Sequence, residues 1–266
     1  VTGVQTCALP ILIAKKTLFV IIILKMKAII LAGGQATRLR PITEDLPKCM
    51  LKVGEITIIE FQINTLKDAG VSNIIIVTGF KAMLLENFIL ETYKDAALHF
   101  IFVFNSEYES TRAAYGLWTA REHLNEETIY LNSDLYCEKE IFKEIINHEK
   151  GSVTAIQNTP WDEEEVNVVI DVDSKVVKIG KLIPAHESSG EFIGATKLSK
   201  EFLKSLISVL GDMVKRGDKQ KFAVDAIQNV ISEGQHTLFA HNVTKYKAIE
   251  IDSIEDYENG KRDRKS

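Results

Sequence analysis

Residues 31–48 read LAGGQATRLRPITEDLPK and follow on from the apolar run 28–31, AIIL. The apolar run predicts a buried strand, and the polar segment 33–48 predicts a long loop. Paired glycines let a backbone approach a ligand closely, and successive N–H groups can bind an anion. Arg38 and Lys48 add two cations that suit phosphate oxygens. The stretch therefore predicts a strand followed by a phosphate-binding loop.

The spacing of this loop differs from two common phosphate-binding motifs. It contains neither the GxxxxGK[ST] pattern of the P-loop nor the GxGxxG pattern of dinucleotide-binding proteins. A simple turn with surface cations would account for a bare pair of glycines. The added sequence Arg38, Pro41 and Thr-x-x-x-Pro-Lys at 43–48 favours a ligand site over such a turn.

Short apolar runs alternate with amphipathic stretches on the carboxyl side of the loop. The expected strands are 28–31, 73–78, 99–104, 128–131 and 152–157, and the expected helices are 57–70, 81–93, 111–124 and 138–148. The run NIIIVT at 73–78 is continuous rather than alternating, which is typical of a strand covered on both faces. This order predicts an α/β fold with a mostly parallel sheet and helices on both faces.

The pattern changes after about residue 162. Three short strands are expected at 166–172, 175–179 and 191–197, followed by helices at 200–210 and 219–233, strands at 237–241 and 246–251, and a last helix at 254–260. We expect one domain over 26–256, with a small sheet-rich lobe on the acceptor side at 162–210. Residues 257–266, which include the polar ending KRDRKS, are expected to form a solvated tail.

The first 25 residues differ from the rest of the chain. Residues 17–24, TLFVIIIL, form an apolar run much shorter than the ~20 residues of a membrane-spanning helix. No small-x-small cleavage site of a secretory signal follows this run. Residues 1–11 also resemble a translated sequencing adapter. We expect a non-native or disordered extension over 1–25 and a native start at Met26; a genuine but poorly packed extension is the alternative.

Composition and charge narrow the function classes. The chain has 266 residues, of which 45% are hydrophobic, and a net charge of −5, so a nucleic-acid partner is disfavoured. Its three cysteines form no CxxC or CxxH pair, which argues against a zinc site and a disulfide framework and indicates a reducing compartment. We expect a cytoplasmic protein with no membrane or nucleic-acid partner, either monomeric or a homodimer.

The loop sequence resembles the signature LAxGxGxRLxPLTxxxPK of the nucleoside-triphosphate transferase family. This family includes sugar-1-phosphate nucleotidyltransferases and the phosphocholine and phosphonate cytidylyltransferases. The resemblance implies a Rossmann-like fold with a mixed sheet. The chain departs from the signature at Ala36, where the family usually has a second glycine. The nucleotide-binding residues that the resemblance implies are Leu31, Ala32, Gly33, Gly34, Arg38, Lys48, Gly79 and Ser133.

Two acidic motifs farther along the chain also match this family. They are Asn132–Ser133–Asp134, after an apolar strand, and residues 250–256, EIDSIED. The resemblance implies that Asp134 and Asp252 together bind Mg²⁺, which prefers one or two carboxylates plus phosphate oxygens. Each aspartate alone could instead cap a helix. The catalytic residues implied are Arg38, Lys48, Asp134 and Asp252.

The carboxy-terminal half resembles the small cytidylyltransferases. The matching segments are 190–194, GEFIG, with Lys197, then 222–225, FAVD, and then 250–256. This resemblance implies transfer of CMP from CTP to a small phosphate or phosphonate, such as phosphocholine or 2-aminoethylphosphonate, with release of pyrophosphate. Contacts to the acceptor amine are expected from Glu191 and Asp225.

Two features leave alternatives open. Relatives often carry paired asparagines where this chain has Thr111–Arg112–Ala113. The acidic run 162–165 could attract an amine-bearing acceptor, although a solvated loop explains it equally well. A sugar-1-phosphate nucleotidyltransferase is the nearest alternative, and a non-catalytic nucleotide-binding module is a more distant one.

Overall fold

A computed structural model describes residues 26–263 of this chain. The extension expected over 1–25 and the last three residues lie outside this described part. No helix within it combines the length and the apolar character that a bilayer crossing requires.

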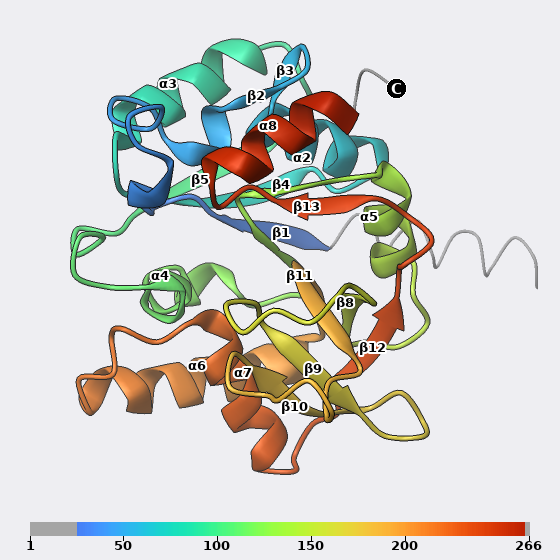
Figure 1. The fold of residues 1–266 in the computed structure, drawn as a ribbon. Helices are drawn as coiled ribbons and strands as arrows, with labels where there is room; N and C mark the ends of the chain where they lie inside the picture. Colours follow the sequence, from blue (N-terminus) through green and yellow to red (C-terminus); the bar gives the residue numbers. More distant parts are fainter. Residues whose placement is uncertain (1–25, 264–266) are drawn as a thin grey trace, which may run out of the picture.

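One large sheet forms the centre of the molecule (Figure 1). Its strands are β1 (Lys27–Leu31), β4 (Asn73–Thr78), β5 (His99–Phe104), β6 (Thr128–Asn132), β8 (Val153–Gln157), β9 (Asn167–Ile170), β10 (Val176–Gly180), β11 (Gly190–Leu198) and β12 (Phe239–Asn242). The main order is β10-β9-β11-β6-β1-β4-β5, with β8 pairing to β11 and β12. Strands β5, β4, β1 and β6 are parallel, whereas β11 runs antiparallel to β6, β8 and β9. The predicted mixed, mostly parallel sheet is confirmed.

Helices cover both faces of the sheet (Figure 1). They are α2 (Ile58–Asp68), α3 (Ala82–Thr92), α4 (Ala113–Thr119), α5 (Lys139–Ile146), α6 (Lys200–Lys215), α7 (Ala223–Ser232) and α8 (Ile254–Asp263). Neighbouring side chains of a strand point to opposite faces. Ala28 and Ile30 of β1 therefore pack into the cluster that contains α2, α3 and α5, while Ile29 packs into the cluster that contains α4, α6 and α7. Burial on both faces explains the continuous apolar runs.

Local sequence signals fix the ends of α2. The Thr57 hydroxyl accepts a hydrogen bond from the backbone N–H of Glu60 at 3.2 Å, and the Thr57 N–H donates to the Glu60 carboxylate at 2.8 Å. This reciprocal capping box satisfies backbone donors that a helix start leaves unpaired. Gly70 adopts φ 86° just after the helix, in the left-handed region that favours glycine. The predicted helix over 57–70 is confirmed to within a residue or two.

Two helices begin later than periodicity predicts. We expected a helix over 111–124, but α4 starts at Ala113 because the Thr111 hydroxyl donates to the Glu107 carbonyl at 2.8 Å and stabilises a turn. We also expected a helix from residue 219. The carbonyls of Lys219 and Lys221 instead accept backbone hydrogen bonds from the N–H groups of Arg112 and Ala114, and α7 begins at Ala223.

Two small antiparallel pairs of strands lie outside the large sheet: β2 (Lys52–Val53) with β3 (Ile56–Thr57), and β7 (Leu135–Cys137) with β13 (Ala248–Glu250). The sequence predicted a strand over 246–251 but missed the other three, because strands of two or three residues carry no readable period.

The expected helix over 254–260 is present and extends three residues further, into the segment expected as a tail. Helix α8 continues to Asp263, and Tyr257 is buried with Leu39, Val53 and Ile251. This apolar contact stabilises the helix against the loop that contains Arg38. The part of the expected lobe that forms β9, β10 and β11 also lies within the large sheet, which places it beside the central strands.

Glu144 on α5 joins that helix to the chain after β12. Its carboxylate accepts hydrogen bonds from His241 at 2.7 Å, Lys245 at 2.8 Å and Tyr246 at 2.6 Å. These hydrogen bonds lower the pKa of Glu144 to about 2. A carboxyl whose pKa is lower in the folded state stabilises the fold above its unfolded pKa, and this contribution is lost as the pH falls towards 2.

We expect Glu144→Gln to lower the free energy of unfolding by about 1–2 kcal/mol at pH 7, a value reduced from the full pKa shift by partial solvent screening. The difference in the free energy of unfolding between the variant and the parent protein should become smaller as the pH falls from 4.5 to 2. Urea titration at each pH measures this free energy. Glu149→Gln, at an exposed glutamate three residues after the end of α5, is the control. A difference that does not change with pH would contradict this account.

Candidate active site

A pocket of about 600 Å³ opens at the carboxyl ends of β1, β4 and β6. Ligands commonly bind at this edge of an open α/β sheet. Most of the residues predicted to bind nucleotide line it: Leu31, Ala32, Gly33, Gly34, Arg38, Lys48 and Ser133. The two predicted metal-binding residues, Asp134 and Asp252, line it as well. Gly79, Glu191 and Asp225 do not line this pocket.

Two short 3₁₀ turns shape the glycine-rich loop, at Thr37–Leu39 and Lys48–Met50. Ala36 precedes the first turn with φ 48° and ψ 49°, a left-handed conformation that costs a residue with a Cβ about 1–2 kcal/mol. The Thr43 hydroxyl donates to the Ala36 carbonyl at 2.8 Å and holds the turn. The conformation explains why the family signature has glycine here, and it shows that the loop forms with alanine.

The two predicted metal-binding aspartates lie on either side of Lys48. The Lys48 ammonium is 2.5 Å from the Asp134 carboxylate and 2.6 Å from that of Asp252. The second oxygen of Asp252 is 2.7 Å from the guanidinium of Arg38. All four predicted catalytic residues therefore form one network of charges.

The pairing of β7 with β13 brings these aspartates together. Glu250 lies opposite Leu135 in this pair, and the Ile251 N–H donates to the Asp134 carbonyl at 3.2 Å. Asp134 is therefore in a turn between two strands and caps no helix. At the start of α8, Asp256 accepts from the Ser253 N–H at 2.8 Å, which leaves the Asp252 carboxylate directed at the cations.

Mutual attraction determines the charge state of this network. Burial works against the charged form of Lys48, but Asp134 and Asp252 outweigh it and raise the pKa of Lys48. Burial likewise opposes ionisation of Asp252, and the nearby Lys48 and Arg38 hold its pKa below the usual value. The two carboxylates therefore stay close because a cation lies between them.

Gly79, just after β4, packs closely against the glycine-rich loop. The Phe80 N–H donates to the Gly33 carbonyl at 3.1 Å, and a Cβ on Gly79 would lie only 2.6 Å from that carbonyl oxygen. The same Cβ would lie 2.6 Å from the Cβ of Tyr108. The absence of a side chain at Gly79 thus allows the glycine-rich loop and the segment after β5 to pack against this position.

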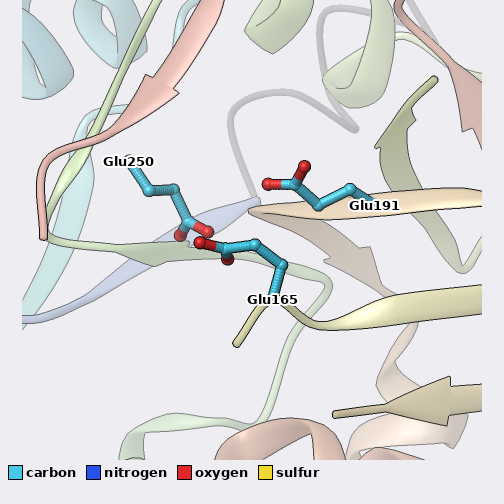
Figure 2. Close-up of side chains that lie close together, drawn as sticks. All are labelled: Glu165, Glu191 and Glu250. Carbon is cyan, nitrogen blue, oxygen red and sulfur yellow. The ribbon is translucent and has the colours of Figure 1, made fainter. Parts of the chain in front are cut away.

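Three glutamates gather beside this network: Glu165, Glu191 and Glu250 (Figure 2). Each offers a carboxylate oxygen, and these three atoms lie within 4.8 Å of one another. Glu250 accepts a hydrogen bond from Asn132 at 2.9 Å, and Glu191 accepts one from Thr159 at 2.5 Å. Glu165 lies just before β9, Glu191 lies on β11, and Glu250 lies on β13.

Burial and nearby negative charges favour the protonated form of each carboxyl in this cluster. Burial, followed by the charge of Glu191, raises the pKa of Glu165 to about 7. Burial and the neighbouring Asp134 raise the pKa of Glu250 well above its usual range, and burial also raises that of Glu191. Such a group of carboxyls stabilises a cation, either an ammonium or a metal ion.

The sequence missed several residues that line the pocket. Glu165 lies in the acidic run 162–165, which fits a solvated loop as well as an amine site. Arg112 and Phe222 were noted only within the segments 111–113 and 222–225, and Lys181 carried no signal of its own. Further missed lining residues are Asn105, Tyr108, Thr111 and Glu250. Asp225 has a local role: its carboxylate accepts the Phe222 N–H at 2.7 Å at the start of α7.

The residues present fit a divalent cation. One oxygen of Asp134 is buried and has no hydrogen-bond partner among the described residues. Lys48 holds the two aspartates close together, and Asp252 also pairs with Arg38. Both aspartates line the pocket, where phosphate oxygens of a ligand could reach them. Carboxylates together with phosphate oxygens are the ligands that Mg²⁺ prefers.

Known nucleotidyltransferases are similar to this chain in sequence and in fold. Residues 27–239 match the family described as nucleotidyl transferase. The CTP:phosphoglutamine cytidylyltransferase of Campylobacter jejuni is 27% identical over 246 residues, which cover 85% of this chain and 93% of that protein. The 2-aminoethylphosphonate cytidylyltransferase of Lancefieldella rimae is 28% identical over 235 residues, covering 86% and 89% of the two chains. The solved structure of the CTP:phosphocholine cytidylyltransferase of Streptococcus pneumoniae has a TM-score of 0.76 at 25% identity, covering 90% of this chain and 99% of that one.

Proposed function

This chain belongs to the nucleotidyl transferase family, and we propose that it transfers CMP from CTP to a small phosphate or phosphonate that carries a cationic amine. Phosphocholine and 2-aminoethylphosphonate are the acceptors of this type that we expect. The observation that carries the proposal is the placement of Asp134, Asp252, Lys48 and Arg38 in one charge network beside a glycine-rich loop. The names of three similar cytidylyltransferases support CTP as the donor.

The glycine-rich loop and its two cations would hold the triphosphate. Backbone N–H groups at Gly33 and Gly34 suit phosphate oxygens, and Arg38 and Lys48 offset their negative charge. An oxygen of the acceptor then attacks the α-phosphorus, and the bond from that phosphorus to pyrophosphate breaks. The attacking oxygen is already an anion near neutral pH, so this step needs no general base. Positioning and charge neutralisation supply the catalysis.

Asp134 and Asp252 would hold Mg²⁺. The ion, when bound, offsets negative charge on the phosphoryl group that is transferred. Lys48 contacts both carboxylates and keeps them together.

The glutamate cluster is our candidate site for the acceptor amine. Glu165 and Glu250 line the pocket, and Glu191 lies against both. A cation bound here would offset the burial and the nearby negative charges that raise the pKa of each glutamate. We prefer this cluster to Asp225, whose carboxylate accepts a backbone hydrogen bond at the start of α7.

Pyrophosphate release tests the proposal. CTP, UTP, dTTP and GTP are each combined with phosphocholine, 2-aminoethylphosphonate and glucose-1-phosphate in the presence of Mg²⁺. We expect turnover with CTP and an amine-bearing acceptor, and its loss on chelation of the metal. Turnover of the hexose phosphate alone would establish a sugar-1-phosphate nucleotidyltransferase instead.

A further inference from the structure

Gln62 is a fully buried polar side chain of helix α2 that does not line the pocket. Its amide nitrogen donates to two backbone carbonyls, that of Asn132 at 2.8 Å and that of Leu135 at 2.9 Å. These carbonyls belong to the last residue of β6 and the first residue of β7. Only Ser133 and Asp134 lie between them, so Gln62 joins both ends of the turn that carries the Asp134 carboxylate.

The two carbonyls determine the orientation of the Gln62 amide. A carbonyl oxygen accepts hydrogen bonds and donates none, so the end of the amide that faces both carbonyls is the NH₂ group, which has two hydrogens. The amide oxygen is buried and has no hydrogen-bond partner within residues 26–263. An unpaired buried acceptor costs about 1–3 kcal/mol, which offsets much of the gain from the two hydrogen bonds. Stability alone therefore gives little reason for a glutamine here, and such exceptions are typical of functional sites.

Helix α2 also contacts the segment that carries Lys48. Lys48 begins a 3₁₀ turn, and Leu51, just after this turn, accepts a hydrogen bond from the Ile58 N–H at 3.0 Å. Ile58 is the first residue of α2, and Gln62 lies about one helical turn further along. One helix therefore contacts both segments that bring the Lys48 ammonium within 2.5 Å of the Asp134 carboxylate.

The helix is well placed to support the turn. The capping box at Thr57 and the left-handed Gly70 fix its two ends. Phe61, the neighbour of Gln62, packs against Tyr136 of β7 with the ring centroids 4.6 Å apart. Side chains that are supported by regular elements hold a site more precisely than loops alone do.

We propose that Gln62 is a positioning residue for the metal site: it holds the turn so that the Asp134 carboxylate, beside that of Asp252, can bind Mg²⁺. This inference rests on the proposed function for the reaction that the site serves. Gln62 itself takes no part in the chemistry. Removing a group that orients a metal ligand commonly lowers metal affinity or activity by roughly 10–100-fold.

Calorimetry of CTP binding, with Mg²⁺ and with a chelator, tests this role without turnover. Gln62→Met keeps an unbranched side chain of similar helix propensity and removes both hydrogen bonds. With the chelator, the affinity for CTP should stay within about threefold of the parent value, because the glycine-rich loop and Arg38 remain in place. The factor by which Mg²⁺ tightens CTP binding should fall by roughly tenfold or more.

Thr65→Val is the matched control. Thr65 is also buried on α2, and its hydroxyl donates to the Phe61 carbonyl at 2.8 Å, so this variant loses a buried hydrogen bond that does not involve the Asp134 turn. Thermal unfolding measures the loss of stability in both variants, and Thr65→Val should keep the parent effect of Mg²⁺. If Gln62→Met does not fold, Gln62→Glu replaces it with the same expected result, since a carboxyl keeps the shape and donates at most one hydrogen bond.

Two results would overturn this role. One is a Gln62 variant in which Mg²⁺ tightens CTP binding as much as in the parent protein. The other is an equal loss of the Mg²⁺ effect in Thr65→Val, which would trace the loss to general destabilisation.

Failure of the proposed function gives a different result. In that case Mg²⁺ does not tighten the binding of CTP, UTP, dTTP or GTP to the parent protein, and amide hydrogen exchange then decides the role of Gln62. The Ile251 N–H donates to the Asp134 carbonyl at 3.2 Å, so its exchange reports on the turn. Faster exchange in Gln62→Met and not in Thr65→Val supports the role, and unchanged exchange refutes it. If a nucleotide other than CTP shows the Mg²⁺ effect, that nucleotide is used for all variants.

Discussion

Asp252→Asn is expected to lower kcat/KM by roughly 10²–10³-fold or more, as the loss of one charge-stabilising group in an active site commonly does. The Asp252 carboxylate contacts Lys48 at 2.6 Å and Arg38 at 2.7 Å, and it is one of the two carboxylates proposed to bind Mg²⁺. The amide keeps the shape and removes the charge. A titration of activity with Mg²⁺ should show a higher concentration for half-maximal rate.

The control for this experiment is Asp173→Asn. Asp173 also pairs with a lysine, Lys175 at 3.0 Å, but in an exposed turn remote from the pocket lining. It should keep the parent activity. Thermal unfolding of both variants separates loss of catalysis from loss of fold. An Asp252→Asn enzyme that keeps near-normal turnover and metal dependence would refute the metal assignment.

Gly79→Ala, just after β4, is expected to destabilise the protein and to displace the glycine-rich loop that Gly79 contacts. Its Cβ would lie 2.6 Å from the Gly33 oxygen and 2.6 Å from the Tyr108 Cβ, and neither atom can move without its backbone. We expect a loss of about 2 kcal/mol in the free energy of unfolding, typical of overpacking. The displaced loop should also raise the KM for CTP about tenfold, the factor for ~1.4 kcal/mol of lost binding.

Gly34→Ala is the matched comparison for stability. A Cβ at Gly34 would have no protein atom within 4 Å, so the free energy of unfolding should stay near that of the parent protein. Urea titration measures this quantity for both variants, and pyrophosphate release measures the KM of the Gly79 variant. If Gly79→Ala keeps the parent stability and the parent KM, then Gly79 does not position the loop.

The sequence predicted the parts of the site that are local in the chain. The loop from Leu31 to Lys48 forms one continuous motif, so its residue types and spacing were readable. Asp134 and Asp252 needed the family resemblance, because the contact between them depends on two strands of three residues each. Hydrophobic periodicity cannot reveal strands so short.

For other site residues, the neighbouring sequence was compatible with more than one role. Glu165 ends a run of acidic residues, and composition alone cannot tell a pocket wall from a solvated loop. Asp225 was assigned to the acceptor through the family resemblance of the segment 222–225. Its contact with the Phe222 N–H carried no local signal, because Phe222, at the position before α7, is not a usual capping residue. The start of α4 depends on contacts with residues 219–221, which no local rule predicts.

The pairing of β7 with β13 has a consequence for biosynthesis. Most of the sheet and its helices come from residues before 240, and a nascent chain of that length already contains Asp134. Asp252 leaves the ribosome more than a hundred residues after Asp134, and β13 must then dock beside a strand made more than a hundred residues earlier. A chain that ended before β13 would therefore contain most residues of the large sheet but lack the partner strand of β7 and the carboxylate that joins Arg38 to Lys48.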